Sequence, residues 1–415
     1  QMCIRDRMCA VYPPRVIAFG ASRRAGPDAS GAESIHTGRV IFNVAIVCQE
    51  KILVEINKET ITSRLGTVID PHTDSDLVDG KSVTEVSVDG VDVKIRLTLG
   101  YPAKSWHGVL TEQVTAALAD LKGLGEVTVD IVTDVVAHEV QKGVTPIKGV
   151  RNIIAIASGK GGVGKSTVAV NLALALASEG ATVGILDADI YGPSQPRMLG
   201  VNQRPESLDG KSLEPLASFQ VQVMSIGFLI EEDSPMIWRG PMVTQALEQL
   251  LNDTRWKDLD YLVIDLPPGT GDIQLTLAQK VPVSGAVIVT TPQNIALLDA
   301  RKGFKMFEKV EIPVLGVIEN MSTHICSECG HEEHIFGAGG GERMADDYDV
   351  EHLGNIPLDS RIRADVDGGK PTVVADPDGV IADIYRQVSR RVGGKLAVRK
   401  RNYSDVFPSI VIENN

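Results

Sequence analysis

The eight residues Gly159–Ser166 constrain this chain more than any other feature of its 415 residues. They match the pattern GxxxxGK[ST], follow the apolar run Ile153–Ala157 and precede Thr167–Ser178, which has helical spacing. Glycines in this setting let backbone N–H groups turn toward phosphate oxygens, and the N-terminus of the following helix adds a favourable dipole. The pattern predicts a nucleotide-binding loop at the carboxyl end of a buried strand.

Three side chains of this loop are candidates for direct roles. Lys165 is expected to contact the β- and γ-phosphates, and Ser166 to offer its hydroxyl group to Mg²⁺. Lys160 is a second lysine, for which an ordinary loop of this pattern has no need. The residues expected to contact the nucleotide, ATP, are Gly159, Lys160, Gly161, Gly162, Val163, Gly164, Lys165, Ser166 and Thr167.

Apolar runs alternate with helical stretches in the part of the chain that contains this loop. Such alternation favours a parallel sheet with helices on both faces, and ligands then bind at the carboxyl ends of the strands. We therefore expect an α/β domain of the P-loop NTPase class over residues 151–393. Its strands are expected at Ile153–Ala157, Val183–Leu186, Tyr261–Ile264, Ala286–Val289 and Val314–Ile318.

Carboxylates follow two of these strands, at the end where the phosphates would lie. Asp265 is the better candidate to hold Mg²⁺ beside Ser166, because this hard ion prefers oxygen ligands. Asp187 is a second candidate, for which a solvated carboxylate at a strand end is the alternative interpretation. Asp189 lies two residues further along the same segment.

A smaller α+β unit is expected over residues 57–141. Asp89-Gly90 lies between two alternating apolar runs, which is a strong signal for a β-hairpin. A helix is expected to end at Asp70-Pro71, since the residue before a proline avoids the α region. The apolar positions of that helix are Ile61, Leu65, Val68 and Ile69, a second helix is expected over Val109–Leu121, and a third strand contains Val127, Val129 and Ile131.

The remaining segments are expected to connect or flank these two units. Residues 142–150 predict a linker, and residues 394–415 a tail that is first basic and then mixed. Residues 1–56 show no sustained period, and a disordered leader or a mis-assigned start is a better interpretation than a signal or transit segment.

The net charge and the positions of the cysteines limit which partners and which cellular location we expect. The formal net charge of -13 argues against broad nucleic-acid binding, which needs a basic surface. The longest apolar run, Val40–Cys48, is shorter than the roughly 20 residues that span a bilayer. Cys3, Cys9 and Cys48 lie in the leader, so the predicted domains contain only Cys326 and Cys329. A disulfide-stabilised secreted protein would spread its pairs through the chain, and we expect a cytoplasmic protein without nucleic-acid or membrane partners.

The sequence from Arg151 to Gly393 resembles two nested groups of ATPases. With Lys160, the loop resembles the deviant-Walker, MinD-like ATPases, in which this lysine reaches the partner's nucleotide across a homodimer. Further motifs resemble the Mrp/ApbC family of iron–sulfur cluster carrier ATPases. They are Asp187–Ser194, Trp238–Pro241, Asp265–Asp272, Glu319–Ser322 and Cys326–Gly330.

The resemblance implies a function and several residue roles. It implies slow ATP hydrolysis coupled to the passage of a labile cluster from a homodimer to apoprotein clients, with assembly factors as further partners. Asn320 would read the adenine ring, and Asp189 would orient or deprotonate the attacking water. The smaller unit resembles a cluster-assembly domain, whose motif Asp70-Pro71 fits. That domain often has a cysteine where this chain has Tyr101–Lys104, so we expect docking rather than metal binding.

Cys326 and Cys329 can point at one metal centre, but two thiolates do not complete a tetrahedral site. Two such pairs that face each other in a symmetric dimer would supply the four thiolates of a four-iron–four-sulfur cluster, as in the family. Zinc held with His331 and His334 in one chain is an alternative, and a redox-active pair is another. Ser327 departs from the proline of many members, which concerns loop stiffness more than ligation.

Two other classes of function compete with the carrier. A MinD/ParA-type spatial-positioning ATPase needs a membrane-binding helix or a basic DNA-binding face. The candidate is the basic stretch from Arg386 to Arg401, which we interpret as a solvated helix end. A reductase component like the nitrogenase iron protein spaces its ligand cysteines far apart, so the CxxC weighs against it.

Overall fold

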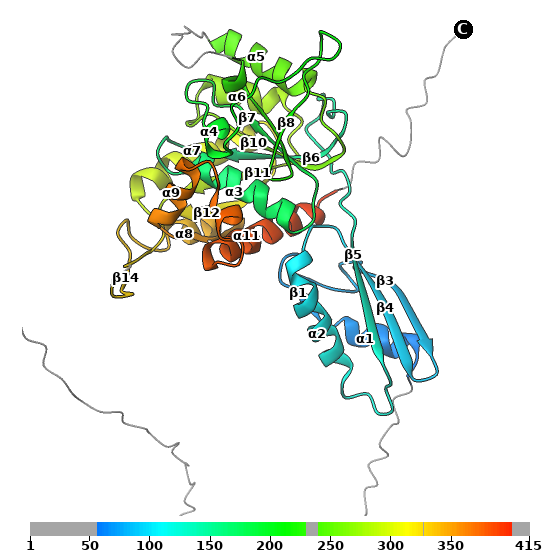
Figure 1. The fold of residues 1–415 in the computed structure, drawn as a ribbon. Helices are drawn as coiled ribbons and strands as arrows, with labels where there is room; N and C mark the ends of the chain where they lie inside the picture. Colours follow the sequence, from blue (N-terminus) through cyan, green and yellow to red (C-terminus); the bar gives the residue numbers. More distant parts are fainter. Residues whose placement is uncertain (1–55, 230–239, 327, 401–415) are drawn as a thin grey trace, which may run out of the picture. The chain divides into compact units, whose positions relative to one another are not determined.

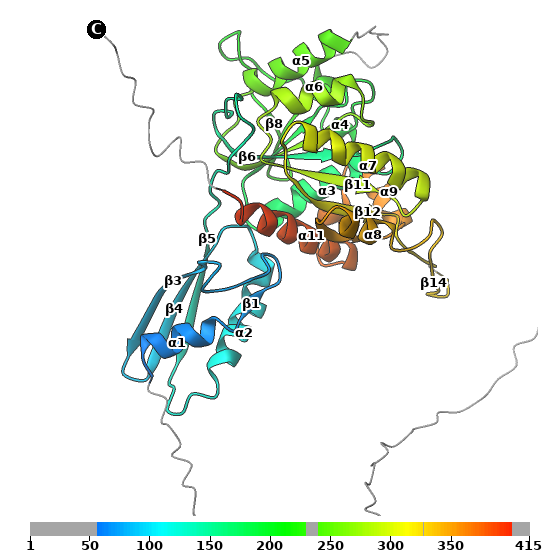
Figure 2. The same ribbon diagram turned by 180° about the vertical axis from the view of Figure 1, so that it is seen from behind.

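The computed structural model describes residues 56–229, 240–326 and 328–400, all within one compact unit of the chain, Leu53–Asn415. The predictions made for the leader, Trp238-Arg239 and Ser327 lie outside the described residues. Figures 1 and 2 show a small α+β domain and a larger domain built on one long sheet. Two further short hairpins pair β1 (Ile69–Asp70) with β2 (Ser75–Asp76), and β13 (His324–Ile325) with β14 (Glu332–Glu333).

The small domain has a three-stranded sheet with two helices. Its elements are α1 (Lys58–Leu65), β3 (Val83–Asp89), β4 (Asp92–Leu99), the 3₁₀ turn η1 (Lys104–Trp106), α2 (His107–Leu118) and β5 (Val127–Thr133). The strands β3 and β4 form the predicted hairpin, in which Gly90 has φ +63°. The strand β5 then pairs parallel with β4, and α2 makes the crossover between them.

The first helix is shorter than the sequence pattern predicted. The Asn57 side chain caps α1 by accepting from the backbone N–H of Thr60 at 2.9 Å. The helix ends at Leu65 with Gly66 as its C-cap, and Ile69 lies in β1 instead. The helical spacing of Val68 and Ile69 was therefore misleading, because the helix already ends at the Gly66 cap, five residues before Pro71.

The larger domain contains an eight-stranded sheet in the order β15-β12-β11-β6-β10-β7-β9-β8. Its strands are β6 (Val150–Ala157), β7 (Val183–Asp187), β8 (Leu216–Ser218), β9 (Val221–Ser225), β10 (Leu259–Asp265), β11 (Gly285–Thr290), β12 (Val314–Asn320) and β15 (Glu351–Ile356). Neighbouring strands are parallel except at the edge, where β8 pairs antiparallel with β9. The predicted α/β fold class is confirmed, and each of the five predicted strands is present with slightly wider bounds.

Helices cover both faces of this sheet (Figure 1). One face contacts α3 (Lys165–Ser178) and α11 (Val380–Ala397), and the other contacts α7 (Asn294–Lys309) and α8 (Gly340–Asp347), beside α5 (Gly240–Asp253) and α6 (Asp272–Lys280). Shorter helices are α4 (Gln195–Met198), η2 (Ile226–Phe228), α9 (Ser360–Asp367) and α10 (Thr372–Ala375). Because α3 is apolar on almost every side, it is buried nearly all round. None of the described helices is both long and apolar enough to cross a membrane.

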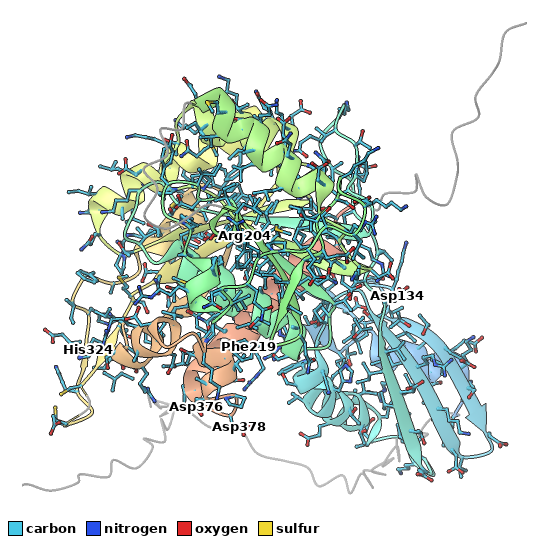
Figure 3. The ribbon with its side chains drawn as sticks, turned by 45° about the horizontal axis from the view of Figure 1, so that its top comes forward. Asp134, Arg204, Phe219, His324, Asp376 and Asp378 are labelled. Carbon is cyan, nitrogen blue, oxygen red and sulfur yellow. The ribbon has the colours of Figure 1, made fainter. Side chains whose placement is uncertain are left out.

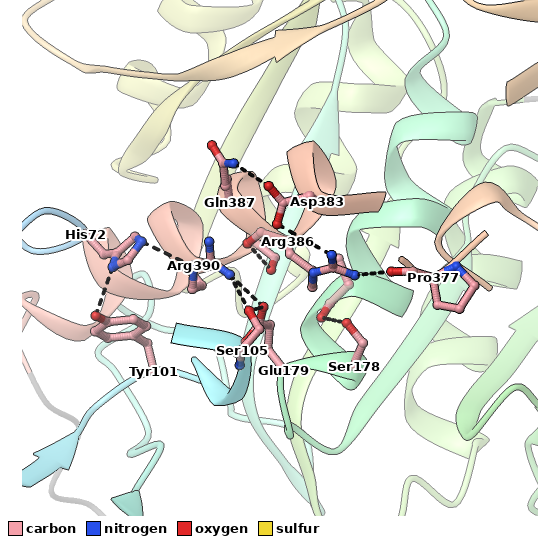
Figure 4. A network of polar contacts seen from close by, with 12 residues as sticks. His72, Tyr101, Ser105, Ser178, Glu179, Pro377, Asp383, Arg386, Gln387 and Arg390 are labelled. Atoms are coloured by element: carbon pink, nitrogen blue, oxygen red, sulfur yellow. Dashed lines mark hydrogen bonds and ion pairs between the residues drawn. The ribbon is translucent and has the colours of Figure 1, made fainter. Parts of the chain in front are cut away.

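The last helix passes residue 393, where we expected a tail to begin. It continues to Ala397, which packs against the core of the small domain, and Leu396 is fully buried. The basic stretch on this helix is therefore more than a solvated helix end. Arg390 is buried and forms an ion pair with Glu179, the C-cap residue of α3 (Figure 4).

Residues of the small domain take part in the same network. The Arg390 guanidinium donates to Ser105 Oγ at 2.6 Å and to Glu179 Oε1 at 2.7 Å, and its Nε donates to His72 Nε2 at 3.3 Å. The backbone N–H of Ser105 donates to the other oxygen of Glu179 at 2.8 Å. A buried ion pair and its hydrogen bonds thus connect the small domain to the end of α3 (Figure 4).

Candidate nucleotide and cysteine sites

The predicted loop Gly159–Ser166 joins β6 to α3, in the expected strand–loop–helix context. Gly162 and Gly164 have φ +82° and +83°, a left-handed conformation that favours glycine. At Gly159 a Cβ atom would lie 2.1 Å from the carbonyl carbon of Asp299 in α7. Gly162 and Gly164 are therefore required by the backbone conformation, and Gly159 by the close approach of the loop to a neighbouring helix.

Lys165 and Asp265 form a buried ion pair at the carboxyl edge of the sheet. Their side chains are 5% and 0% exposed. The ammonium of Lys165 also lies 3.1 Å from Ser166 Oγ. The structure thus brings together Lys165, Ser166 and Asp265, a cation, a hydroxyl group and a carboxylate.

Gln195, at the start of α4, completes this cluster, and the sequence interpretation missed it. Its Nε2 donates to the backbone carbonyl of Ser166 at 3.1 Å and to Asp265 Oδ2 at 2.9 Å. The side chain is fully buried, and its Oε1 has no hydrogen-bond partner among the described residues. The available signal was its position directly after the motif that ends at Ser194.

Asp187 is completely buried, so its interpretation as a solvated carboxylate is wrong. Its Oδ2 accepts from the backbone N–H groups of Ser194 at 2.9 Å and Gln195 at 3.0 Å, and from Ser225 Oγ at 3.1 Å. Burial, and then the charge of Asp265 on the neighbouring strand, raise the pKa of Asp187 to about 7. The side chain fixes the segment that leads to Gln195, and its role as a metal ligand stays a prediction.

Asp189 and Lys160 are both half-buried. Burial raises the pKa of Asp189, and the charge of Lys165 opposes that shift. A carboxylate with a raised pKa is better suited to accept a proton than an ordinary aspartate. The backbone carbonyl of Lys160 accepts from Ser158 Oγ at 2.9 Å, which holds the beginning of the loop. The catalytic roles expected for both side chains stay predictions.

Asn320 lies at the carboxyl end of β12 and contacts the loop from across the sheet. Its Nδ2 donates to the backbone carbonyl of Val163 at 2.8 Å. The side chain is 7% exposed. The described contact holds the loop, and the expected contact with adenine stays a prediction.

Cys326 and Cys329 lie at the turn of the hairpin formed by β13 and β14. The backbone N–H of Cys326 donates to His331 at 2.9 Å, and that of Gly330 donates to the carbonyl of Cys326 at 2.9 Å. Both cysteines are free, Cys326 half-buried and Cys329 exposed. Hydrogen bonds from the backbone N–H groups of Cys329 and Glu328 lower the pKa of the Cys326 thiol. A lowered pKa favours the thiolate, which is the form that binds metal.

The histidines near this pair do not gather around it in the described part of the chain. His334 Nδ1 lies 3.1 Å from the backbone carbonyl of Ser322, and His324 Nδ1 lies 3.0 Å from that of Leu358. Since a carbonyl only accepts, both Nδ1 atoms donate. Within residues 56–229, 240–326 and 328–400, no three side chains of His, Cys, Asp or Glu come together as a metal site.

The motif of the small domain is used for its own packing. Asp70 accepts from Tyr101 Oη at 2.7 Å and from the backbone N–H of His72 at 2.9 Å. Burial alone would raise the pKa of Asp70, but the hydrogen bonds from His72 and Tyr101 outweigh it and lower the pKa. Tyr101, the first residue of the stretch Tyr101–Lys104, thus stabilises a buried carboxylate.

Two family models match the chain. Residues 149–393 match a ParA-type model described as NUBPL iron-transfer P-loop NTPase, which is more than half of the chain. Residues 58–131 match a model described as iron-sulfur cluster assembly protein.

Individual relatives agree with these matches. An iron-sulfur cluster carrier protein of Escherichia coli K12 is 56% identical over 70% of this chain and 80% of its own length. One of Pseudomonas fragi is 59% identical over 68% of this chain and 98% of its own length. A solved structure of a nucleotide-binding protein from Archaeoglobus fulgidus, in complex with ADP and with Co found in it, is 37% identical with a TM-score of 0.50. It covers 57% of this chain and 93% of its own.

Proposed function

The chain belongs to the family of NUBPL-type iron-transfer P-loop NTPases, and from this premise we propose that it is an ATP-hydrolysing carrier of iron–sulfur clusters. It holds a labile cluster between two copies of the chain and passes it to apoproteins. The observation that carries this proposal is a pair of free thiols on a hairpin that directly follows β12, the strand whose last residue contacts the nucleotide loop.

Two copies of the chain are needed because the described residues of each copy supply two thiolates, those of Cys326 and Cys329. A four-iron–four-sulfur cluster takes four cysteine ligands, and a two-fold axis between two hairpins provides them. The exposure of Cys329 and of the neighbouring Ile325, which is 56% exposed, supports a shared site at this hairpin. Lys160, half-buried in its loop, is then the residue that reaches the nucleotide of the partner subunit.

The cluster around Lys165 suits ATP and Mg²⁺. Ser166 and Asp265 offer the oxygen ligands that Mg²⁺ prefers, and Asp187 is a further candidate beside them. When bound, Mg²⁺ neutralises charge on the phosphates. Lys165 contacts the β- and γ-phosphates, while the N–H groups of the loop surround them.

Two other side chains complete the nucleotide site. Asp189 orients the attacking water, since its raised pKa suits a group that accepts a proton. Asn320 donates to Val163 through its nitrogen and uses its amide oxygen for the adenine amino group.

Partners and location follow from the same premise. The partners are apoprotein clients and assembly factors, and the location is the cytoplasm, where the cysteines stay reduced.

A spatial-positioning ATPase fits less well. The basic stretch that would bind DNA or a membrane includes Arg390, which is buried against Glu179. The small domain serves for docking, in agreement with the structural use of Asp70 and Tyr101.

Anaerobic reconstitution with iron and sulfide tests the carrier proposal. The wild type is expected to acquire a visible absorption band and about two iron ions per chain, as one four-iron cluster shared by two chains requires. Cys326→Ala and Cys329→Ala are each expected to lose the band and the iron. Cys48→Ala, the same substitution outside the CxxC, is the control and is expected to behave as the wild type. Full absorption and iron content in both CxxC variants would contradict the proposal.

A further inference from the structure

One hydrogen bond connects the nucleotide loop to Asn320, the last residue of β12. The cysteine segment, residues 321–339, begins directly after it and leads to α8. Asn320 Nδ2 holds the carbonyl of Val163 at 2.8 Å, and a Cβ atom at Gly164 would lie 2.2 Å from the same nitrogen. The amide of Asn320 thus packs directly against the peptide between Val163 and Gly164. A rotation of that peptide therefore displaces the Asn320 side chain or breaks this hydrogen bond.

The chain beyond Asn320 begins with a strained residue. Met321 has φ +57°, a left-handed backbone conformation that is uncommon for a side chain of its size. Its methyl carbon would lie 3.7 Å from a Cβ at Gly164, so Met321 also packs beside the loop. Strained residues of this kind persist where the surrounding structure determines them, often in segments that switch.

Two hydrogen bonds hold Ser322, the residue after Met321. The backbone N–H of Ser322 donates to Ile356 at 3.1 Å, and its carbonyl accepts from His334 Nδ1 at 3.1 Å. His334 follows β14, so this bond fixes the returning strand of the hairpin onto the outgoing one. The hairpin itself stands out from the domain in two views (Figures 1 and 2), and Figure 3 labels His324 on its first strand.

The far end of the cysteine segment, where α8 begins, is held by Glu319, the residue before Asn320. The carboxylate of Glu319 is buried and accepts from the backbone N–H of Gly341 in the first turn of α8. A Cβ atom at Gly341 would lie 2.9 Å from Cβ of Glu319, so the two backbones are closely packed. The last two residues of β12 therefore position the nucleotide loop on one side and both ends of the cysteine segment on the other.

We propose that Asn320 is a positioning residue that couples the nucleotide loop to the cysteine hairpin, so that a bound nucleotide changes the reactivity of the Cys326 and Cys329 thiols. The inference rests on the proposed nucleotide binding. Phosphates draw the N–H groups of the loop toward them, and Asn320 and Ser322 transmit the resulting shift of the Val163 peptide. Coupling between two binding sites is reciprocal, so a ligand on the cysteines changes nucleotide affinity by the same factor.

Peptide-resolved alkylation measures this coupling. The tryptic peptide Val310–Arg343 contains both cysteines of the hairpin and no others. The full-length protein is treated with iodoacetamide, with and without saturating MgADP, and the labelling rate of this peptide is followed by mass spectrometry. Binding of MgADP is measured separately by calorimetry on the same samples. In the wild type, MgADP is expected to change the labelling rate by at least about fivefold, the lower end of typical coupling.

Two variants interrupt the route at different points. Asn320→Ala removes the bond to Val163, and His334→Ala removes the bond to Ser322 without touching the nucleotide loop. Both are expected to reduce the effect of MgADP on labelling to less than about twofold. His334→Ala is expected to keep its affinity for MgADP. Asn355→Ala is the matched control, because the Asn355 side chain is exposed on β15 and its hydrogen bond is to His352, while the backbone pairing of β15 with β12 is kept. It is expected to keep the full effect.

The outcomes separate this inference from the proposed function. A wild type that fails to bind MgADP contradicts nucleotide binding itself. A wild type that binds MgADP with unchanged labelling overturns the coupling and leaves the proposed function intact. If both variants bind MgADP and keep the full change in labelling, the route through Asn320 is wrong.

Discussion

Replacing Lys165 with alanine is expected to lower kcat for ATP hydrolysis by at least about 100-fold, which is typical when a group that stabilises the transition-state charge is removed. The physical reason is the position of the ammonium. It lies 3.1 Å from Ser166 Oγ and is paired with the buried carboxylate of Asp265, at the first residue of α3. Among the described residues, Lys165 is the one cation that forms an ion pair with Asp265, and the other carboxylate oxygen accepts from the neutral amide of Gln195.

Steady-state phosphate release measures this effect. Lys211→Ala serves as a control, because Lys211 is exposed and far along the chain from the loop, and its turnover is expected to equal that of the wild type. Cys329→Ala is expected to keep nucleotide binding, since the described hydrogen bonds of the cluster around Lys165 involve Ser166, Asp265 and Gln195 and no residue of the hairpin. A Lys165→Ala protein that hydrolyses ATP at the normal rate would show that this loop is not the catalytic site.

Replacing Glu179 with alanine is expected to lower the free energy of unfolding by about 3–5 kcal/mol, the usual cost of removing one partner of a buried ion pair. Arg390 is 5% exposed and Glu179 is 0% exposed, so the remaining guanidinium charge would be buried without its counter-charge. Two hydrogen bonds from Ser105 to the same carboxylate would also be lost. Urea unfolding measures the difference in the free energy of unfolding between this variant and the wild type.

Two further proteins make this test specific. The double variant Glu179→Ala/Arg390→Met removes both charges and is expected to recover a large part of the lost stability. Asp367→Ala removes one partner of an exposed pair, in which Arg363 is 73% exposed, and is expected to cost less than about 1 kcal/mol. Equal stability of Glu179→Ala and the wild type would show that the network does not hold the small domain to the end of α3.

Much of the fold follows from short-range patterns in the sequence. The five buried strands of the large domain are continuous apolar runs, and the hairpin at Gly90 has the turn residues that its left-handed conformation needs. The first helix is shorter than its sequence pattern predicts, because Val68 and Ile69 continue the apolar period beyond the cap at Gly66. Local spacing does not reveal where a cap interrupts a period.

The site residues that belong to a recognisable sequence motif could be predicted. Those that are defined by contacts between distant segments could not. Lys165, Ser166 and Asp265 were expected together, and the sheet order brings them together. Gln195 and the buried state of Asp187 depend on contacts between segments that are distant in the sequence. Arg390 illustrates the same limit, since a basic period on a helix does not show that Glu179 lies opposite it.

The central claim, a cluster shared by two chains, is tested most directly by native mass spectrometry of the reconstituted protein under anaerobic conditions. The account predicts a species with the mass of two chains plus one four-iron–four-sulfur cluster, which is absent from Cys326→Ala and Cys329→Ala. A single chain that holds its own cluster or one zinc ion, with the cysteines of its CxxC as ligands, would contradict it.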